Sequence, residues 1–322
     1  MLSPVYQPVY RPKPAPARPQ TQAQRLEELI GNTPLLDLSR TAVAHGLSPR
    51  VSLFAKAEWF NPGGSVKDRA ALNIIRTAEK DGRLRPGMTL IDSTSGNTGI
   101  AYAMLGAARG YRVKLVVPQN ISPERLAILR AYGAELIFTD PMDGSDGALE
   151  EARRLAAADP SLFYARQYDN PANWRAHYLT TANEIWQQTD GTITHFVAGM
   201  GTSGTFMGTM RRLKELNPAI LGHAVQPDSP FNGLEGLKHM PTAIKPGIYD
   251  ASLADDVRAV RTEDAYQMAR FLARQEGVFV GISAAAAVWA ATAVGQTLEA
   301  GTIVTILPDS GLKYLSERFW NE

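Results

Sequence analysis

The sequence predicts an α/β protein with two parallel-sheet domains covered by helices. Short apolar runs of strand length alternate along the chain with segments of helical period, which is the rhythm of parallel sheets with helices on both faces. The 322 residues are enough for two lobes with a sizeable core. The composition, 44% apolar and 20% charged, is that of an ordinary globular protein.

The expected elements form two series. The first opens with a short helix over 26–30, and its helix 67–81 carries Leu72, Ile75 and Ala78 on one face. The expected strands of the first series are 51–57, 89–92, 113–117 and 134–138, and its further helices are 99–109, 123–132 and 147–157. The second series has strands 193–198, 222–225 and 303–307 and helices 207–216, 263–276 and 284–294.

Composition and charge exclude several classes of function. The chain has 33 basic and 32 acidic residues, a net charge of +1, which gives no reason to expect nucleic acid or an anionic membrane as partner. It has no cysteine, so disulfides, iron–sulfur clusters and a cysteine nucleophile are excluded. Its five histidines are scattered, and we expect no metal site. No apolar run approaches the ~18 residues of a membrane span, so we expect a cytoplasmic enzyme.

Residues 1–24 form a proline-rich, basic segment. They contain no acidic residue and few side chains that could build a core, so we expect an extended or disordered tail. A docking arm for a partner subunit is the alternative interpretation.

The first motif with chemical meaning reads Asn61-Pro-Gly-Gly-Ser-Val-Lys67-Asp-Arg69. A glycine-rich loop leads directly into a helix and places Lys67 in its first turn. The positive end of the helix dipole disfavours a charged lysine there, and a neutral amine is what a Schiff-base lysine needs. By itself the motif is also compatible with a surface lysine.

Two further loops follow buried strands and open helices. The first, Ser93-Thr-Ser-Gly-Asn-Thr-Gly99, gathers hydroxyls and backbone N–H groups into a site suited to a carboxylate, or into an elaborate helix cap. The second, Gly199-Met-Gly201-Thr-Ser-Gly204-Thr205, matches the dinucleotide fingerprint in letters, but Gln226 stands where an acidic residue is required. Its hydroxyls suit a terminal phosphate.

A fourth motif lies at the end of the last expected strand. Asp309, Ser310 and Gly311 follow Leu307, at the carboxyl end of a strand, where open α/β sheets place their ligands. Four features together suggest pyridoxal 5′-phosphate (PLP) acting on an amino acid. They are a loop suited to a carboxylate, a loop suited to a phosphate, a lysine at the start of a helix and polar residues at the end of a strand.

In this order the segments resemble the cysteine synthase (O-acetylserine/O-phosphoserine sulfhydrylase) family of PLP fold type II, from about Ile30 to Ser316. The stretch around Gly236-Leu-Lys238-His-Met-Pro241 is more similar to the B-type isozyme branch, which accepts bulkier sulfur donors such as thiosulfate. The matching motifs are Ile30-Gly-Asn-Thr-Pro-Leu35, Lys67-Asp-Arg69, Thr94-Ser-Gly-Asn-Thr98, Gln167, Asn170-Pro-Ala-Asn173, Gly201-Thr-Ser-Gly-Thr205 and Lys313-Tyr-Leu-Ser316.

The resemblance implies a tryptophan synthase β-like fold, with a small mobile domain over 61–170 and a large PLP-binding domain over 25–60 and 171–322. It also implies a homodimer, a possible serine acetyltransferase partner, and PLP as cofactor bound covalently to Lys67. The other expected cofactor ligands are Asn97, Gly201, Thr202, Ser203, Gly204, Thr205 and, at the pyridine nitrogen, Asp309 or Ser310. Thr94, Ser95, Gly96, Thr98 and Gln167 are expected to bind the substrate carboxylate, and Lys238 to select the activated serine.

Two departures from the family pattern affect fine positioning. Ala284-Ala285 replaces the usual Ser-Gly, and if that glycine needs positive φ, alanine costs about 1–2 kcal/mol. Thr180-Thr-Ala-Asn183 stands where relatives usually have Thr-Thr-Gly-Pro.

The resemblance implies β-replacement, in which O-acetylserine or O-phosphoserine loses its β-substituent and sulfide or thiosulfate adds, giving L-cysteine or S-sulfocysteine. Lys67 would act as the general base on Cα. Condensation of serine with homocysteine, as in cystathionine β-synthase, is one alternative. A serine or threonine dehydratase fits less well, because its phosphate loop is usually all glycine. A non-catalytic amino-acid-sensing or partner-binding protein is the alternative from another class.

Overall fold

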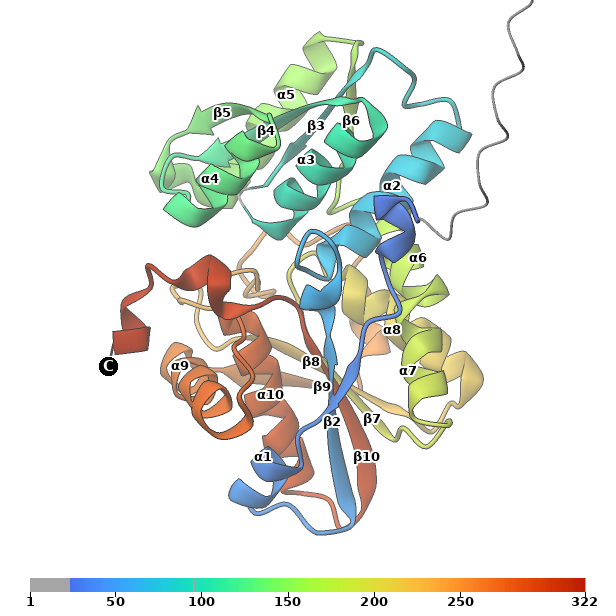
Figure 1. Cartoon of the computed structure of the whole chain (residues 1–322), viewed down its shortest axis with the longest axis vertical. Coiled ribbons are helices and arrows are strands. Elements are labelled where there is room, and N and C mark those ends of the chain that lie inside the picture. Colours follow the sequence, from blue (N-terminus) through green and yellow to red (C-terminus); the bar gives the residue numbers. More distant parts are fainter. Residues whose placement is uncertain (1–23, 95, 322) are drawn as a thin grey trace, which may run out of the picture.

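The computed structural model describes residues 24–94 and 96–321. The tail expected over 1–24 lies outside this part apart from its last residue, and so does Ser95. Within the described residues the strands form a six-stranded sheet, in the order β1-β2-β10-β7-β8-β9, and a four-stranded sheet, in the order β5-β4-β3-β6. Figure 1 shows the two sheets in two lobes, one above the other. The prediction of two helix-covered parallel sheets is confirmed, with one exception at β1.

The larger sheet is formed by strands from both ends of the described chain. Its strands are β1 (Leu35–Asp37), β2 (Val51–Ala57), β7 (His195–Gly199), β8 (Leu221–Pro227), β9 (Asp256–Val260) and β10 (Gly301–Leu307). All neighbouring pairs are parallel except β1 and β2, which are antiparallel with Leu35 opposite Lys56. The last five residues of β10 are buried, because a central parallel strand is covered on both faces.

Helices cover both faces of the larger sheet. One apolar cluster lies under α1 (Ser39–Ala44), α9 (Thr262–Phe271) and α10 (Ile282–Gly295), and the other lies under α7 (Thr181–Gln188) and α8 (Gly204–Leu216). Helix α10 is apolar all round and almost wholly buried, as expected for a core helix. Helix α6 (Pro171–Leu179) packs on α8.

The smaller sheet is wholly parallel. Its strands are β3 (Thr89–Ser93), β4 (Arg112–Pro118), β5 (Glu135–Thr139) and β6 (Leu162–Tyr164). One apolar cluster joins the sheet to α2 (Lys67–Lys80) and α3 (Asn97–Arg109), and a second joins it to α5 (Gly144–Ala158). Helix α4 (Pro123–Ala131) packs against α3. The division at residues 61 and 170 and the mobility of the smaller domain remain predictions.

Short helical turns complete the described chain. The helix expected over 26–30 is a 3₁₀ turn over Leu26–Leu29, and the helix expected over 263–276 ends its α-helical part at Phe271 and continues as a π turn to Glu276. The other 3₁₀ turns are Glu58–Phe60, Pro141–Asp143, Ala251–Leu253, Gly311–Tyr314 and Arg318–Asn321. In the described residues, no helix has the length and apolar character needed to cross a membrane.

Ala284 and Ala285 do not carry the strain that a replaced positive-φ glycine would bring. Both lie inside α10, and neither is among the described non-glycine residues with positive φ. Both side chains are fully buried in the core of the larger lobe. The cost of about 1–2 kcal/mol, expected if alanine replaced a glycine with positive φ, therefore does not apply.

Gly208 gives a test of the α6–α8 contact. A Cβ atom at this position in α8 would overlap the backbone carbonyl of Trp174 in α6, which cannot move without separating the helices. We expect Gly208→Ala to lower the free energy of unfolding by about 1–3 kcal/mol, the usual range for overpacking. Urea unfolding followed by circular dichroism measures the loss.

Gly222→Ala is the matched control for Gly208→Ala. Its Cβ would meet only the flexible side chain of Met210, so the loss should be much smaller. Equal losses in the two variants would contradict the assignment of the cost to backbone contact between α6 and α8.

Candidate active site

A cavity of about 560 Å³ lies where the carboxyl ends of strands from both sheets meet. Its walls include the first residues of α2, α3, α8 and α10, and the 232–238 segment, residues of the long connection between β8 and β9. Helix N-termini present unpaired N–H groups and a partial positive charge, so this arrangement favours anionic ligands. The structure describes no cluster of residues with the composition of a metal site.

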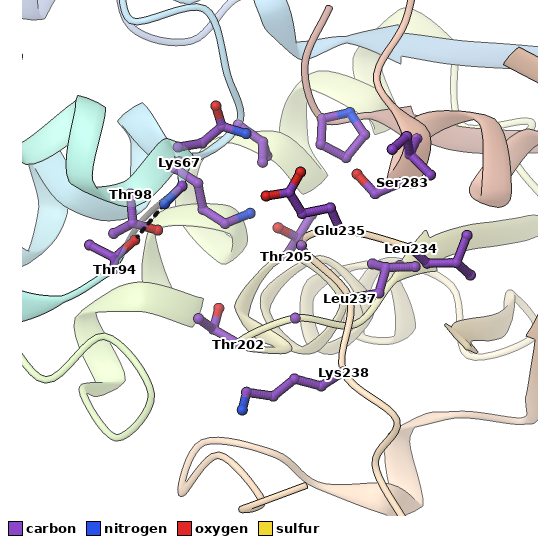
Figure 2. Close-up of a pocket in the computed structure, with 18 of the residues that line it drawn as sticks. Lys67, Thr94, Thr98, Thr202, Thr205, Leu234, Glu235, Leu237, Lys238 and Ser283 are labelled. Atoms are coloured by element: carbon purple, nitrogen blue, oxygen red, sulfur yellow. Dashed lines mark hydrogen bonds between the residues drawn. The ribbon is translucent and has the colours of Figure 1, made fainter. Parts of the chain in front are cut away.

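Lys67 is the first residue of α2 and lines this cavity. Figure 2 shows its side chain extending into the cavity, on the side where Thr94 and Thr98 lie. Burial lowers the pKa of its amine, with Asp309 acting in the opposite direction. A neutral amine is a nucleophile and a proton acceptor, which is the state needed to form a Schiff base or remove a proton.

The backbone that precedes Lys67 is fixed to the end of β10. The N–H of Val66 donates to the carbonyl oxygen of Pro308 at 2.8 Å, and Ser65 forms an isolated antiparallel bridge with Asp309. Ser65 Oγ also accepts from the N–H of Lys67 at 3.2 Å. The lysine is therefore positioned by the larger sheet, although α2 packs on helix α3 of the smaller lobe.

A buried group of ion pairs fixes the first turn of α2. Arg69 contacts Glu58 at 2.7 Å and Glu184 at 2.6 Å, and Glu184 contacts Lys56 at 2.8 Å. Burial acts to raise the pKa of Glu58, but Arg69 outweighs it and the pKa is lowered. The pKa of Glu184 is lowered to about 2 in the same way, against the effect of burial, by Arg69 and Lys56. Glu58, Glu184 and Arg69 are therefore charged at neutral pH.

Asn97, the first residue of α3, has both ends of its amide fixed. Its Nδ2 donates to Asp309 Oδ2 at 2.7 Å, and its Oδ1 accepts from Lys313 Nζ at 2.7 Å. The hydroxyl of Tyr314 donates to the same oxygen of Asp309 at 2.9 Å. The network leaves one N–H of Asn97 for a ligand in the cavity, as expected of a residue that contacts an oxygen on the cofactor ring.

Asp309 and Ser310 do not lie among the residues that line the cavity. Asp309 is fully buried behind Asn97, and Ser310 forms a backbone bridge with Val280. The structure thus does not support a direct contact of either residue with the pyridine nitrogen. Ser283, in the first turn of α10, does line the cavity and is drawn there in Figure 2, so it is the better candidate. The sequence signal for Ser283 is its place directly before Ala284-Ala285, the two residues that depart from the family pattern.

The expected carboxylate cradle lies at the start of α3. Thr94, Gly96 and Thr98 line the cavity, and the N–H of Gly96 donates to Thr94 Oγ1 at 3.3 Å. Gln167 also lines the cavity, and its Nε2 donates to the carbonyl oxygen of Ser93 at 3.0 Å. Because Ser93 is the last residue of β3, this bond attaches the Gln167 side chain to the start of the 93–99 loop. Ser95, the remaining residue expected here, lies outside the described residues.

The phosphate cradle expected over 201–205 lines the cavity at the start of α8. A Cβ on Gly201 would overlap the carbonyl of Gly236, and a Cβ on Gly204 would overlap Asn173, so both glycines are required by close approach. Ser203 has φ of 69°, and its buried hydroxyl has no hydrogen-bond partner in the described part of the chain. An unsatisfied hydroxyl beside a helix N-terminus is what a phosphate group would complete, so these residues fit the cofactor.

Residues outside the predicted set support this cradle. Asn173 Nδ2 donates to Thr202 Oγ1 at 3.0 Å, and His177 Nε2 lies 3.3 Å from Thr205 Oγ1. Burial lowers the pKa of His177 to about 3, so its ring is neutral. Asn173 belongs to a motif that carries the resemblance, but its partner could not be predicted from the sequence.

The 232–238 segment forms the remaining wall. Lys238 Nζ lies 3.5 Å from Asp146 of α5 and 5.0 Å from the ring centroid of Tyr168, and its side chain is only 13% exposed. Glu235 forms an ion pair with Arg125 of α4. Both pairs join the segment to helices of the smaller lobe. Lys238 is therefore a partly desolvated cation in the cavity wall, as the selection of an anionic substrate requires.

Comparison with known proteins gives a consistent result. Residues 26–309 match the family described as pyridoxal-phosphate dependent enzyme. The cysteine synthase of Aquifex aeolicus is 50% identical over 300 residues, covering 92% of this chain and 91% of that protein. Cysteine synthase B of Escherichia coli is 44% identical, covering 92% and 96%. The crystal structure of cysteine synthase from Entamoeba histolytica superposes with a TM-score of 0.89 at 38% identity, covering 97% of this chain and 95% of that one.

The position of Asp309 predicts that it orients Asn97. Asp309→Ala removes the acceptor for the buried Tyr314 hydroxyl and the partly buried Asn97 amide, which typically costs about 1–3 kcal/mol. We therefore expect PLP to bind the apoprotein about tenfold more weakly. Fluorescence titration of the apoprotein with PLP measures this without any turnover.

Asp309→Asn is the matched control, because both hydrogen bonds go to one oxygen that an amide can also supply. We expect it to bind PLP nearly as well as the wild type. An unchanged affinity in Asp309→Ala would show that Asn97 does not depend on this residue.

Proposed function

Because this chain belongs to the family of pyridoxal-phosphate dependent enzymes and catalyses PLP-dependent cysteine synthesis, we propose that its reaction is β-replacement on an activated serine with Lys67 as cofactor lysine. The observation that carries the proposal is that one lysine, whose pKa is lowered by burial, faces a cavity with two anion-binding loops, each at a helix N-terminus. One loop suits the cofactor phosphate and the other the carboxylate of an amino acid.

Each loop has a separate task in this proposal. Gly201, Thr202, Ser203, Gly204 and Thr205 hold the cofactor phosphate, and Asn97 holds the ring oxygen. Thr94, Gly96, Thr98 and Gln167 surround the substrate carboxylate, and Ser95 belongs to the same proposed set. Because the carboxylate and the phosphate are bound at different helices, the amino acid is held between them with its Cα near Lys67.

Lys67 has two roles in the chemistry. PLP, when bound, withdraws electrons from Cα of the amino acid. The free Lys67 amine would remove the proton from Cα as a general base. The bond from Cβ to its acetate or phosphate substituent then breaks, a sulfur nucleophile forms a new bond to Cβ, and Lys67 returns the proton to Cα.

The burial of the site supports proton transfer by Lys67 rather than by water. Burial lowers the pKa of the free amine, so a larger fraction is able to accept a proton at neutral pH. The cavity walls also limit exchange of that proton with solvent. The same lysine can therefore return it at the end of the reaction.

The identity of the sulfur donor and of the leaving group belongs to this proposal. Sulfide or thiosulfate are the proposed donors, and O-acetylserine or O-phosphoserine the proposed substrates. Condensation of serine with homocysteine would use the same residues up to the entry of sulfur. Parallel assays with sulfide, thiosulfate and homocysteine, each with either activated serine or serine, separate these reactions by their products.

A homodimer, a serine acetyltransferase partner and a cytoplasmic location remain predictions. Light scattering of the purified protein tests the first, and co-purification with a serine acetyltransferase tests the second.

Lys67 is expected to be the only lysine that carries the cofactor. The purified protein should be yellow, and borohydride reduction followed by peptide mapping should place a pyridoxyl group on Lys67. Lys67→Ala should lose covalent attachment and nearly all cysteine formation, whereas Lys238→Ala should keep the attachment. A pyridoxyl group on any other lysine would contradict the assignment.

Lys238 is expected to favour O-phosphoserine over O-acetylserine. The phosphate leaving group is a dianion and the acetyl ester is neutral, and a charge-assisted contact is worth roughly 1.5–3 kcal/mol. Lys238→Ala should therefore lower kcat/KM for O-phosphoserine by about 10- to 150-fold relative to O-acetylserine. Stopped-flow absorbance of the first half-reaction measures both values.

Lys245→Ala is the matched control, because it removes the same charge from an exposed lysine in the same connection between β8 and β9. It should leave the ratio of kcat/KM for O-phosphoserine to that for O-acetylserine unchanged. An equal effect of Lys238→Ala on both substrates would leave Lys238 without a role in selection.

A further inference from the structure

Arg125 is a buried cation in the cavity wall that the proposed reaction does not use. It lies in the first turn of α4 and lines the cavity together with Glu235 and Tyr314. Its guanidinium carbon lies 5.0 Å from the centroid of the Tyr314 ring, and the residue is only 3% exposed. A charged group at this depth needs compensation by an anion or by hydrogen bonds.

The compensation in this structure is incomplete. Nη1 of Arg125 forms an ion pair with Glu235, but Nε is buried and has no hydrogen-bond partner among the described residues. A guanidinium offers five N–H donors in a planar fork, which fits two oxygens of one anion. The unsatisfied Nε is therefore a second, independent sign that a ligand completes this site.

Glu235 is suited to leave Arg125 when such a ligand arrives. Its side chain is 40% exposed, and it lies in the irregular 232–238 segment rather than in a helix or strand. Moving it into water costs little, whereas Arg125 cannot follow because it is buried under Tyr314. Glu235 and Lys67 line the same cavity and are both labelled in Figure 2, so an anion replacing the Glu235 carboxylate would lie inside the reaction cavity.

We propose that Arg125 binds a tetrahedral oxoanion carried by a substrate, and that Glu235 occupies this position until the oxoanion displaces it. The exchange replaces one anion by another beside the same buried cation, so it avoids the cost of leaving Arg125 unpaired. The oxoanion is the sulfonate end of a donor such as thiosulfate or the phosphate of O-phosphoserine. Sulfide and O-acetylserine have no such group.

This inference rests on the proposed function and adds a determinant of substrate choice to it. Arg125 is distinct from Lys238, because the two cations pair with different residues and lie on different elements. A planar fork can bind two oxygens at once, which an ammonium group does less well. Arg125 therefore recognises geometry as well as charge.

The first test measures binding alone. Titration calorimetry of the holoenzyme with sodium thiosulfate, without any amino acid, should give a dissociation constant about tenfold lower for Glu235→Gln than for wild type, because the competing anion is gone. Arg125→Lys keeps the charge but loses the fork, and it should bind thiosulfate at least tenfold more weakly than wild type.

Glu317→Gln is the matched control. Glu317 also lines the cavity, but the structure records no ion pair between it and Arg125. A general gain in positive charge would strengthen thiosulfate binding equally in both glutamine variants. Stronger binding in Glu235→Gln alone supports the proposal, and equal or absent changes overturn it. This comparison does not depend on whether Arg125→Lys folds.

The second test identifies the source of the oxoanion. We expect Glu235→Gln to raise, and Arg125→Lys to lower, either the ratio of kcat/KM for thiosulfate over sulfide or that for O-phosphoserine over O-acetylserine. A change in the first ratio assigns the site to the sulfur donor, and a change in the second assigns it to the leaving group. If neither ratio changes while wild type still makes cysteine from O-acetylserine and sulfide, this inference fails and the proposed function stands.

Discussion

The buried ion pairs around Arg69 are the constraint on which the rest of the site depends. Arg69 and Lys56 meet Glu58 and Glu184 almost without access to water, two residues along α2 from Lys67. Removing one member would leave a buried charge without compensation, which typically destabilises by about 3–5 kcal/mol. Because both carboxylates come from the larger lobe, the group fixes the direction in which α2, and with it Lys67, enters the cavity.

The cavity combines helix N-termini with a lysine whose pKa is lowered by burial. Helix N-termini favour anionic groups in the cavity, while burial lowers the pKa of the Lys67 amine. The two effects have the same origin, since a positive environment without water favours anions and disfavours an ammonium group. The positions of Asn97 and Thr202 are then fixed by partners outside the cavity, Lys313 and Asn173. The polar groups of these two residues therefore have fixed positions before a ligand binds.

Most strands, most helices and the ligand loops could be predicted because their signals are local. Buried parallel strands are continuous apolar runs, and the glycines and hydroxyls of each loop are adjacent in sequence. The strands β1 and β6 were missed, because three residues carry no periodicity. Strand β9 was missed as well, because Asp256 and Arg258 interrupt its apolar residues. The helices α1, α6 and α7 were not predicted, because each has fewer than ten residues and shows too few turns of apolar periodicity.

Long-range partners account for the rest of what was missed. Asp309 was expected in the cavity from its place after β10. Its side chain instead accepts a hydrogen bond from Asn97, more than 200 positions away in the chain, and does not line the cavity. Ser283, Arg125 and Glu235 come from three separate segments, and no local pattern relates them.

The topology also sets an order of assembly during translation. All four strands of the smaller sheet lie between residues 89 and 164, so this lobe has its strands early. In the larger sheet β2 pairs with β10, which comes after every other strand of that sheet and lies between β2 and β7. The early strand β2 therefore has an open parallel edge until β10 is made, and such an edge is where a nascent chain is most exposed to aggregation and to chaperones.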